Sequence, residues 1–139
     1  MKKLLTALAL VAVFAAASFA GVQDFGKFTV DVPEGWTATQ DGETVGIVKN
    51  DNSAALSISV DSTDGASLKE IADEFVKALN GRNLAFTDGT YQFEMTNANG
   101  VDSKAVLSGD DSNYALFVIT GAENAPDEIS KMLDSVKEK

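Results

Sequence analysis

The sequence predicts an α+β fold in which an antiparallel sheet of about six or seven strands packs with two helices, in the order β-β-β-α-β-β-β-β-α. Residues 67–81 have apolar side chains at helical spacing and signals for both helix ends. Short segments before and after them alternate apolar and polar residues, as strands with one buried face do. Hairpin turns separate these segments and no crossover pattern is present, so we expect neighbouring strands to be antiparallel.

The first 20 residues have the pattern of a signal peptide. Two lysines precede an apolar run over residues 4–17, and small residues follow at Ser18 and Ala20, where a signal peptidase reads the chain. A membrane anchor is the competing interpretation, but this run is shorter than the ~20 apolar residues of a membrane span. We therefore expect residues 1–20 to be removed on export, which leaves residues 21–139 as a single domain without a membrane span.

The chain is acidic and contains neither histidine nor cysteine. It has 11 basic and 21 acidic residues, a formal net charge of -10, and loss of the two signal-peptide lysines makes the charge -12. Nucleic-acid phosphates and anionic membranes would be repelled, so neither is an expected partner. Acidity also keeps exported proteins soluble. Because no disulfide can form, a hydrophobic core must supply the stability.

The residues before the helix predict three strands. Residues 28–32 alternate apolar and polar side chains until a proline ends the pattern. Residues 44–49 and 56–61 flank a polar turn at residues 50–53, which predicts an antiparallel hairpin. For the single tryptophan, Trp36, packing at the end of the core is favoured over a role as a ligand platform.

The central helix has an S-x-x-E capping box at Ser67 and Glu70, which satisfies backbone N–H groups in its first turn. Asn80 and Gly81 end it, and we expect Gly81 to adopt the left-handed conformation. One face is apolar and must pack on the sheet. This face consists of Leu68, Ile71, Ala72, Phe75 and Leu79.

Four strands are predicted after this helix. Residues 84–87 and 90–96 flank Asp88-Gly89, the signal for a type I′ hairpin. Asn99-Gly100 predicts the next turn, into a strand over residues 101–108. Residues 114–120 are apolar on both faces, which is typical of a central strand covered on each side.

The last element is a second helix that begins near Asn124. Pro126 lies in its first turn, where the missing N–H does no harm. Its apolar stripe consists of Ile129, Met132, Leu133 and Val136.

No residue has the signature of a catalytic or cofactor-binding group. Without histidine and cysteine, a histidine-based triad, a cysteine nucleophile and nearly every zinc site are excluded. A Ser/Lys pair or two carboxylates remain chemically able to do acid-base work, but the sequence places none at a defining spacing. No nucleotide-binding motif is present. We expect no enzyme activity and no cofactor.

Calcium is the metal for which the sequence offers candidate ligands, because five aspartates lie in polar segments. Their spacing does not match an EF-hand loop, so ordinary turns are favoured and we expect no metal site. These aspartates are Asp51, Asp61, Asp64, Asp110 and Asp111.

The stretch Phe28-Thr-Val-Asp-Val-Pro-Glu-Gly-Trp36, followed by a hairpin and then by Ser67-Leu-Lys-Glu-Ile-Ala-Asp-Glu-Phe75, resembles the opening of the PsbP/Mog1-like superfamily. Its bacterial members include DcrB-like exported proteins. The resemblance implies an antiparallel sheet packed with helices, and a role as an assembly factor or binding partner rather than a catalyst. With only two helices, we expect sheet cover to be incomplete and the strand face with Ser57, Ser59 and Asp61 to be wet.

Two functions remain open. One is an exported, non-catalytic binding or accessory protein, periplasmic or secreted, with an unidentified protein partner. The alternative is a periplasmic carrier of a small apolar or cationic ligand, which requires an enclosed pocket with a few convergent polar groups. An enzyme is the least favoured third class.

The lack of cysteine and of a metal motif predicts a fold that is indifferent to reductants and chelators. We expect the melting temperature of the purified protein to be the same with and without EDTA or dithiothreitol, as measured by differential scanning calorimetry. A large decrease with EDTA would show that a metal supports the fold.

Overall fold

The computed structural model describes residues 20–96 and 100–138. Residues 1–19 of the predicted signal peptide, and Asn99 of the predicted Asn99-Gly100 turn, lie outside the described residues. The elements in chain order are β1 (Gly21–Asp24), β2 (Phe28–Val32), β3 (Trp36–Asp41), β4 (Thr44–Lys49), β5 (Ala55–Ser62), α1 (Leu68–Ala78), β6 (Arg82–Thr87), β7 (Thr90–Thr96), β8 (Asp102–Gly109), β9 (Asn113–Thr120), the 3-10 helix η2 (Ala122–Asn124), α2 (Pro126–Ser135) and β10 (Lys137–Glu138).

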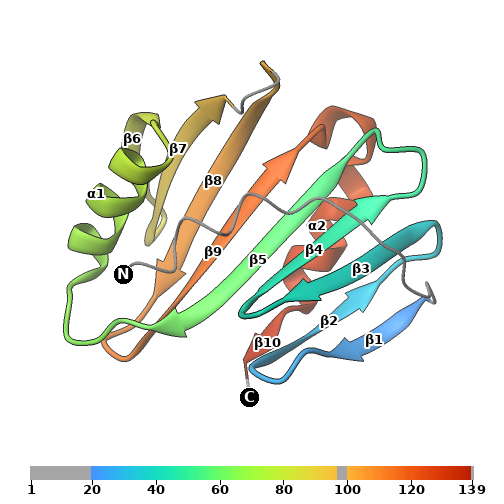
Figure 1. Ribbon diagram of the computed structural model, residues 1–139, viewed down its shortest axis with the longest axis horizontal. Helices are drawn as coiled ribbons and strands as arrows, with labels where there is room; N and C mark the ends of the chain where they lie inside the picture. Colours follow the sequence, from blue (N-terminus) through green and yellow to red (C-terminus); the bar gives the residue numbers. More distant parts are fainter. Residues whose placement is uncertain (1–19, 97–99, 139) are drawn as a thin grey trace.

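The main sheet has seven antiparallel strands in the order β3-β4-β5-β9-β8-β7-β6 (Figure 1). A smaller sheet has the order β1-β2-β10. The predicted α+β fold with a seven-stranded sheet and two helices is confirmed. Strands β1, β3 and β10 were not predicted, because β1 and β10 are very short and β3 has apolar side chains only at Trp36 and Ala38.

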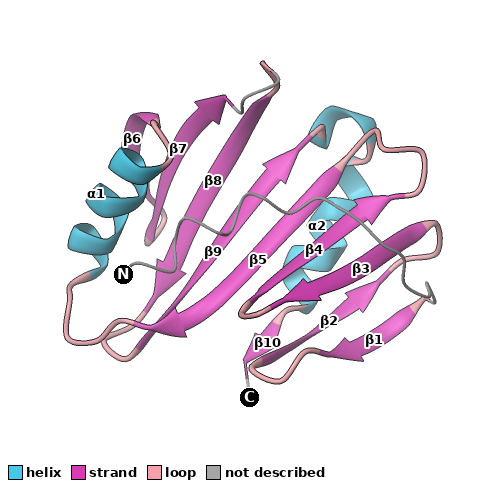
Figure 2. Ribbon diagram, in the orientation of Figure 1, coloured by secondary structure: helices cyan, strands magenta, loops and turns pink. Residues whose placement is uncertain are grey.

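Two hydrophobic cores lie on opposite faces of the sheet, and β9 belongs to both. Tyr114, Leu116 and Val118 pack with the apolar face of α1. Ala115 and its alternate neighbours Phe117 and Ile119 pack with α2 and β2. Figure 2 shows α1 at the β6–β8 end of the sheet and α2 behind the β4–β5 end. The prediction that residues 114–120 form a central strand is therefore confirmed.

Helix α1 has the predicted capping box. The amide of Glu70 donates to Ser67 Oγ at 3.1 Å, and the amide of Ser67 donates to Glu70 Oε1 at 2.9 Å. At the other end, the prediction for Gly81 is wrong, because Asn80 is the left-handed residue, with φ 56°. Asparagine tolerates this conformation. The amide of Gly81 donates to the carbonyl of Val76 at 2.8 Å and completes the cap.

Gly81 is needed for a different reason, which is space. A Cβ atom at this position would lie 2.6 Å from Cδ2 of Phe93, so a larger residue would displace the ring from the core under α1. The turn at Asp88 and Gly89 has φ values of 53° and 83°, as the type I′ prediction requires.

Trp36 is only 1% exposed, which confirms its predicted packing role. It lies in the core between the sheet and α2, and Lys49 Nζ lies 6.0 Å from its ring centroid. Its indole Nε1 has no hydrogen-bond partner among the described residues. Pro126 occupies the first turn of α2, as predicted.

We expect Ser67→Ala to lower the free energy of unfolding by about 1 kcal/mol, because the Glu70 amide loses the Ser67 Oγ that accepts its hydrogen bond. Urea denaturation measures the change. Ser130→Ala is the matched control, since Ser130 is exposed in the interior of α2 and alanine favours helices. An equal effect of the two substitutions would show that the cap contributes nothing specific.

Candidate interaction surface

Each described α-helix covers one half of one sheet face, so neither α1 nor α2 lies over the other two halves of the sheet (Figure 1). The first, here called the β3–β5 half-face, lies on the α1 side of the sheet and is rich in hydroxyl groups. Its polar side chains are partly exposed, and Asp41 is exposed. Ser57, Ser59 and Asp61, which the sequence predicted to be wet, are among the partly exposed ones. The polar residues of this half-face are Thr37, Thr39, Asp41, Thr44, Ser57, Ser59 and Asp61.

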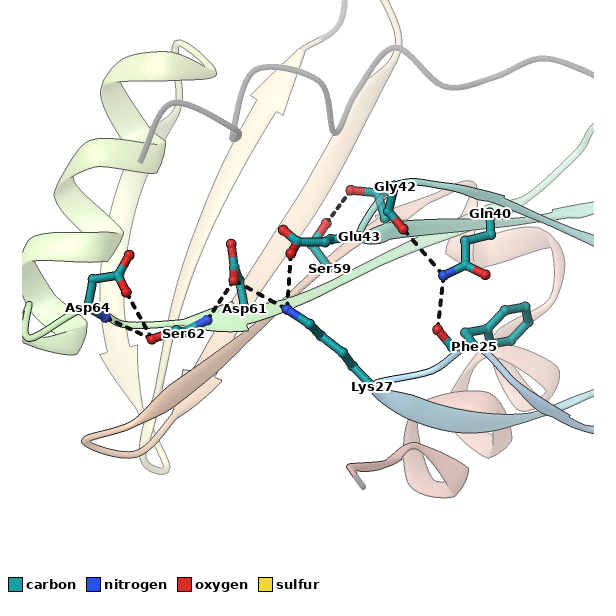
Figure 3. A network of polar contacts seen from close by, with 10 residues as sticks. Phe25, Lys27, Gln40, Gly42, Glu43, Ser59, Asp61, Ser62 and Asp64 are labelled. Carbon is teal, nitrogen blue, oxygen red and sulfur yellow. Dashed lines mark hydrogen bonds and ion pairs between the residues drawn. The ribbon is translucent and has the colours of Figure 1, made fainter.

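A lysine joins the small sheet to one end of this half-face. Lys27 Nζ lies 3.0 Å from Glu43 Oε2 and 3.4 Å from Asp61 Oδ1 (Figure 3). The hydrogen bond to Glu43 is the main cause that raises the pKa of Lys27. Gln40 supports the same junction, since its Nε2 donates to the carbonyl of Phe25 at 2.9 Å. These contacts connect the β1–β2 turn with β3, the β3–β4 turn and β5, which is a structural role.

The five candidate calcium ligands are not gathered into a site. Asp51 accepts hydrogen bonds from Ser53, and Asp110 accepts from the amides of Ser112 and Asn113. These bonds lower the pKa of both carboxyls. Within residues 20–96 and 100–138, no group of three or more acidic side chains is placed to hold a metal ion. The turn interpretation of Asp51 and Asp110 agrees with this geometry.

The second uncovered area, here called the β6–β8 half-face, lies on the α2 side of the sheet and is charged. Arg82 Nη2 lies 3.4 Å from Asp102 Oδ1, and Arg82 Nε lies 3.8 Å from Glu94 Oε1. Thr96 Oγ1 donates to Asp102 Oδ1 at 2.7 Å. The hydrogen bond from Thr96, followed by the Arg82 guanidinium, holds the pKa of Asp102 below its usual value. Lys104 lies opposite Glu94 in the register of β7 and β8, so the two cations and two carboxylates balance.

Two open grooves of about 510 and 430 Å³ meet near Gly121, at the end of β9. Both are lined by Asp102, Gly121 and Glu123, and neither is enclosed. Polar and apolar atoms contribute comparably to their walls. They therefore lack the closed apolar form that a carrier of an apolar ligand needs.

The third feature is the β6 edge of the sheet. Five of the six residues of β6 are exposed, and Phe86 is 60% exposed although it is a large apolar residue. Its ring contacts Tyr91 on β7, with the two centroids 4.6 Å apart. Among the described strands, β6 pairs only with β7, so one side of its backbone faces no other strand of the described chain.

The sequence singled out no ligand-binding residue, and it did not identify Phe86. In the sequence, residues 84–87 read as an ordinary strand with one buried face. Phe86 becomes conspicuous only through the strand order, which places β6 at the end of the sheet. A large aromatic residue next to a hairpin turn was the available signal.

No known protein family matches the sequence, and no curated protein matches it either. Several solved structures share the fold, among them a cyanobacterial and a Bacteroides protein. The cyanobacterial PsbP protein (CyanoP) of Synechocystis has 13% sequence identity and a TM-score of 0.55, with 93% of this chain and 99% of that protein covered. A protein of Bacteroides thetaiotaomicron has 13% identity and a TM-score of 0.52, with 81% of this chain covered.

This chain spans 45% of the length of the Bacteroides protein. At these identities the similarity shows the fold alone, and the PsbP-like fold implied by the sequence resemblance is confirmed. The Mog1-like and DcrB-like parts of the resemblance stay predictions. None of the helices in the described part of the chain has the length and apolar composition of a membrane span.

We expect Thr96→Val to raise the pKa of Asp102 towards its ordinary value of 3.8, because the strongest cause of the lowered pKa is the hydrogen bond from Thr96. A carboxyl whose pKa is lowered in the folded state stabilises the fold at pH values above its ordinary pKa. This stabilisation is lost as the pH falls through the pKa of the folded state. Carbon-detected NMR titration of the Asp102 carboxyl measures the shift. Thr90→Val, which removes a hydroxyl from the other end of β7, is the control. An unchanged Asp102 pKa in the Thr96 variant would contradict the assignment.

Proposed function

We propose that this protein is an exported, non-catalytic binding or accessory protein that engages a protein partner through exposed parts of its sheet. The observation that carries the proposal is the unpaired β6 edge with Phe86 60% exposed. An exposed strand edge is a template for pairing with another chain, and exposed aromatic residues are enriched in protein interfaces.

The side-chain chemistry supports a role without catalysis. The chain has no histidine or cysteine, which removes the commonest nucleophiles and general bases. The carboxylates with lowered pKa, such as Asp51 and Asp110, form turns through local hydrogen bonds. The sequence resemblance to the PsbP/Mog1-like superfamily also favours a binding role, since its named members act as assembly factors or partners.

Export is the second part of the proposal and depends on residues 1–20. Their charged start, apolar run and small-residue end are those of a signal peptide. Residues 21–139 are then the mature single domain, which works in the periplasm or outside the cell.

A carrier of a small cation is a second candidate function. The 510 Å³ groove is lined by Asp102, which Arg82 already contacts, and by Glu123, and its described lining has no basic residue, which favours a positive charge near Glu123. Native mass spectrometry of the purified protein would detect a retained cation. An apolar ligand has no comparable support.

We expect photo-crosslinking in cells to capture a protein partner from the sheet surface. A photoreactive phenylalanine analogue is placed at Phe86 on the β6 edge, at Ser57 on the β3–β5 half-face, or at Lys131 on the exposed side of α2. The tagged protein is then isolated from the extracytoplasmic fraction and its crosslinks are identified by mass spectrometry. The same protein should be enriched from Phe86 or Ser57 and not from Lys131.

Two results would contradict the proposal. One is the absence of any position-specific crosslink together with turnover of a substrate that is lost when one carboxylate is replaced. The other is recovery of the tagged protein only from the cytoplasm, which would contradict export.

A further inference from the structure

The two edges of the main sheet differ in how open they are. Strand β3, at one edge, runs beside β2 of the small sheet (Figure 1), and the nearby carbonyl of Gly35 accepts a hydrogen bond from Asn50. Strand β6, at the other edge, is exposed at five of its six residues. Of the two edges, β6 is the one open to a further strand.

The register shows which backbone groups of β6 point outward. Thr87 and Thr90 flank the two-residue turn and are therefore a hydrogen-bonded pair. Phe86 and Tyr91, the next pair, are not hydrogen-bonded to each other. The close approach of their rings, 4.6 Å between centroids, agrees with this pair type. The N–H and C=O of Phe86 consequently point away from β7, towards the free edge.

A β-bulge limits how far another strand can extend along β6. The register with β7 shifts between Arg82 and Ala85, and Asn83 has a φ of 60°. Bulges are one of the ways in which proteins end an edge. Between the bulge and the turn, Leu84–Thr87 contains no charge and no proline, so these four residues are free of the usual edge protection.

The turn end of this short edge is negatively charged, because Asp88 lies in the turn that follows β6. At the other end Arg82 lies between Glu94 and Asp102, and Lys104 lies opposite Glu94, so the charges there balance. A second copy of this chain carries the same formal net charge of -10, which opposes its approach. A segment with basic residues beside Asp88 is complementary.

We infer that β6 binds an extended segment of a partner protein as an eighth strand of the sheet. The segment pairs with the backbone at Phe86, covers the Phe86 ring with an apolar side chain, and carries Lys or Arg at the end next to Asp88. This mode of recognition uses main-chain hydrogen bonds for affinity and alternate side chains for specificity. The inference rests on the proposed function, because it names the surface and the chemistry of the partner.

The test uses three synthetic ten-residue peptides with the same alternating Val and Thr centre. The first peptide has two lysines at each end, and the second has two glutamates at each end. The third has two lysines at each end and a proline in its centre. Amide hydrogen exchange by NMR should show that the lysine peptide slows exchange of the Phe86 amide and leaves the already paired Ala85 amide unchanged. The glutamate and proline peptides should have no effect. Binding should weaken as salt rises.

Two variants with a matched control separate the aromatic and charge contributions. Phe86→Ala should weaken binding of the lysine peptide about tenfold, because the ring that the peptide covers is lost. Asp88→Asn should weaken binding of the lysine peptide about two- to fivefold, because a negative charge beside the peptide is lost. The turn is kept, because asparagine followed by glycine suits a type I′ turn. Val22→Ala, which removes an apolar side chain that is also mostly exposed from β1, should leave binding of the lysine peptide unchanged.

Several outcomes would overturn the inference. They are an unprotected Phe86 amide, equal binding of the glutamate peptide, or a dimer that sedimentation shows to form through β6. Crosslinking in cells to a partner from Ser57 alone would overturn the β6 assignment and leave the proposed function standing. A lysine peptide that binds while no cellular partner crosslinks would instead support the edge chemistry and contradict the proposed function.

Discussion

Strand β9 packs against a different hydrophobic core on each of its faces, and the arrangement of the other elements depends on this. Its even-numbered side chains, such as Leu116, face α1, and its odd-numbered ones, such as Ala115, face α2 and β2. A strand without a polar face must be covered on both sides. Because each core is built from a short helix, each covers only part of its side of the sheet.

The uncovered parts of the sheet follow from the placement of these helices. Serine and threonine are found on the β3–β5 half-face, where α1 does not reach, while ion pairs around Arg82 are found on the β6–β8 half-face, where α2 does not reach. Polar residues at these positions keep a partly covered sheet soluble. Phe86 departs from this pattern, and such departures are expected at functional sites.

Much of the fold was predictable because local signals agreed with tertiary packing. Ser67 and Glu70 defined the start of α1, and the Asp88-Gly89 turn defined the β6–β7 hairpin. Strand β3 was missed because an edge strand with few apolar residues has little alternation to detect. The candidate surface was not predictable for a related reason: an edge is a property of strand order, and strand order depends on contacts between distant residues.

The small sheet brings the two ends of the described chain together. Strand β10 pairs with β2, and the amide of Asp31 donates to the Ser135 hydroxyl, 104 residues further along. Helix α2 covers the same strand. The core around β2 is therefore incomplete until α2 and β10 have been synthesised, and contacts between such distant residues form slowly. Strand β2 thus depends for its final partners on residues about 100 positions further along the chain.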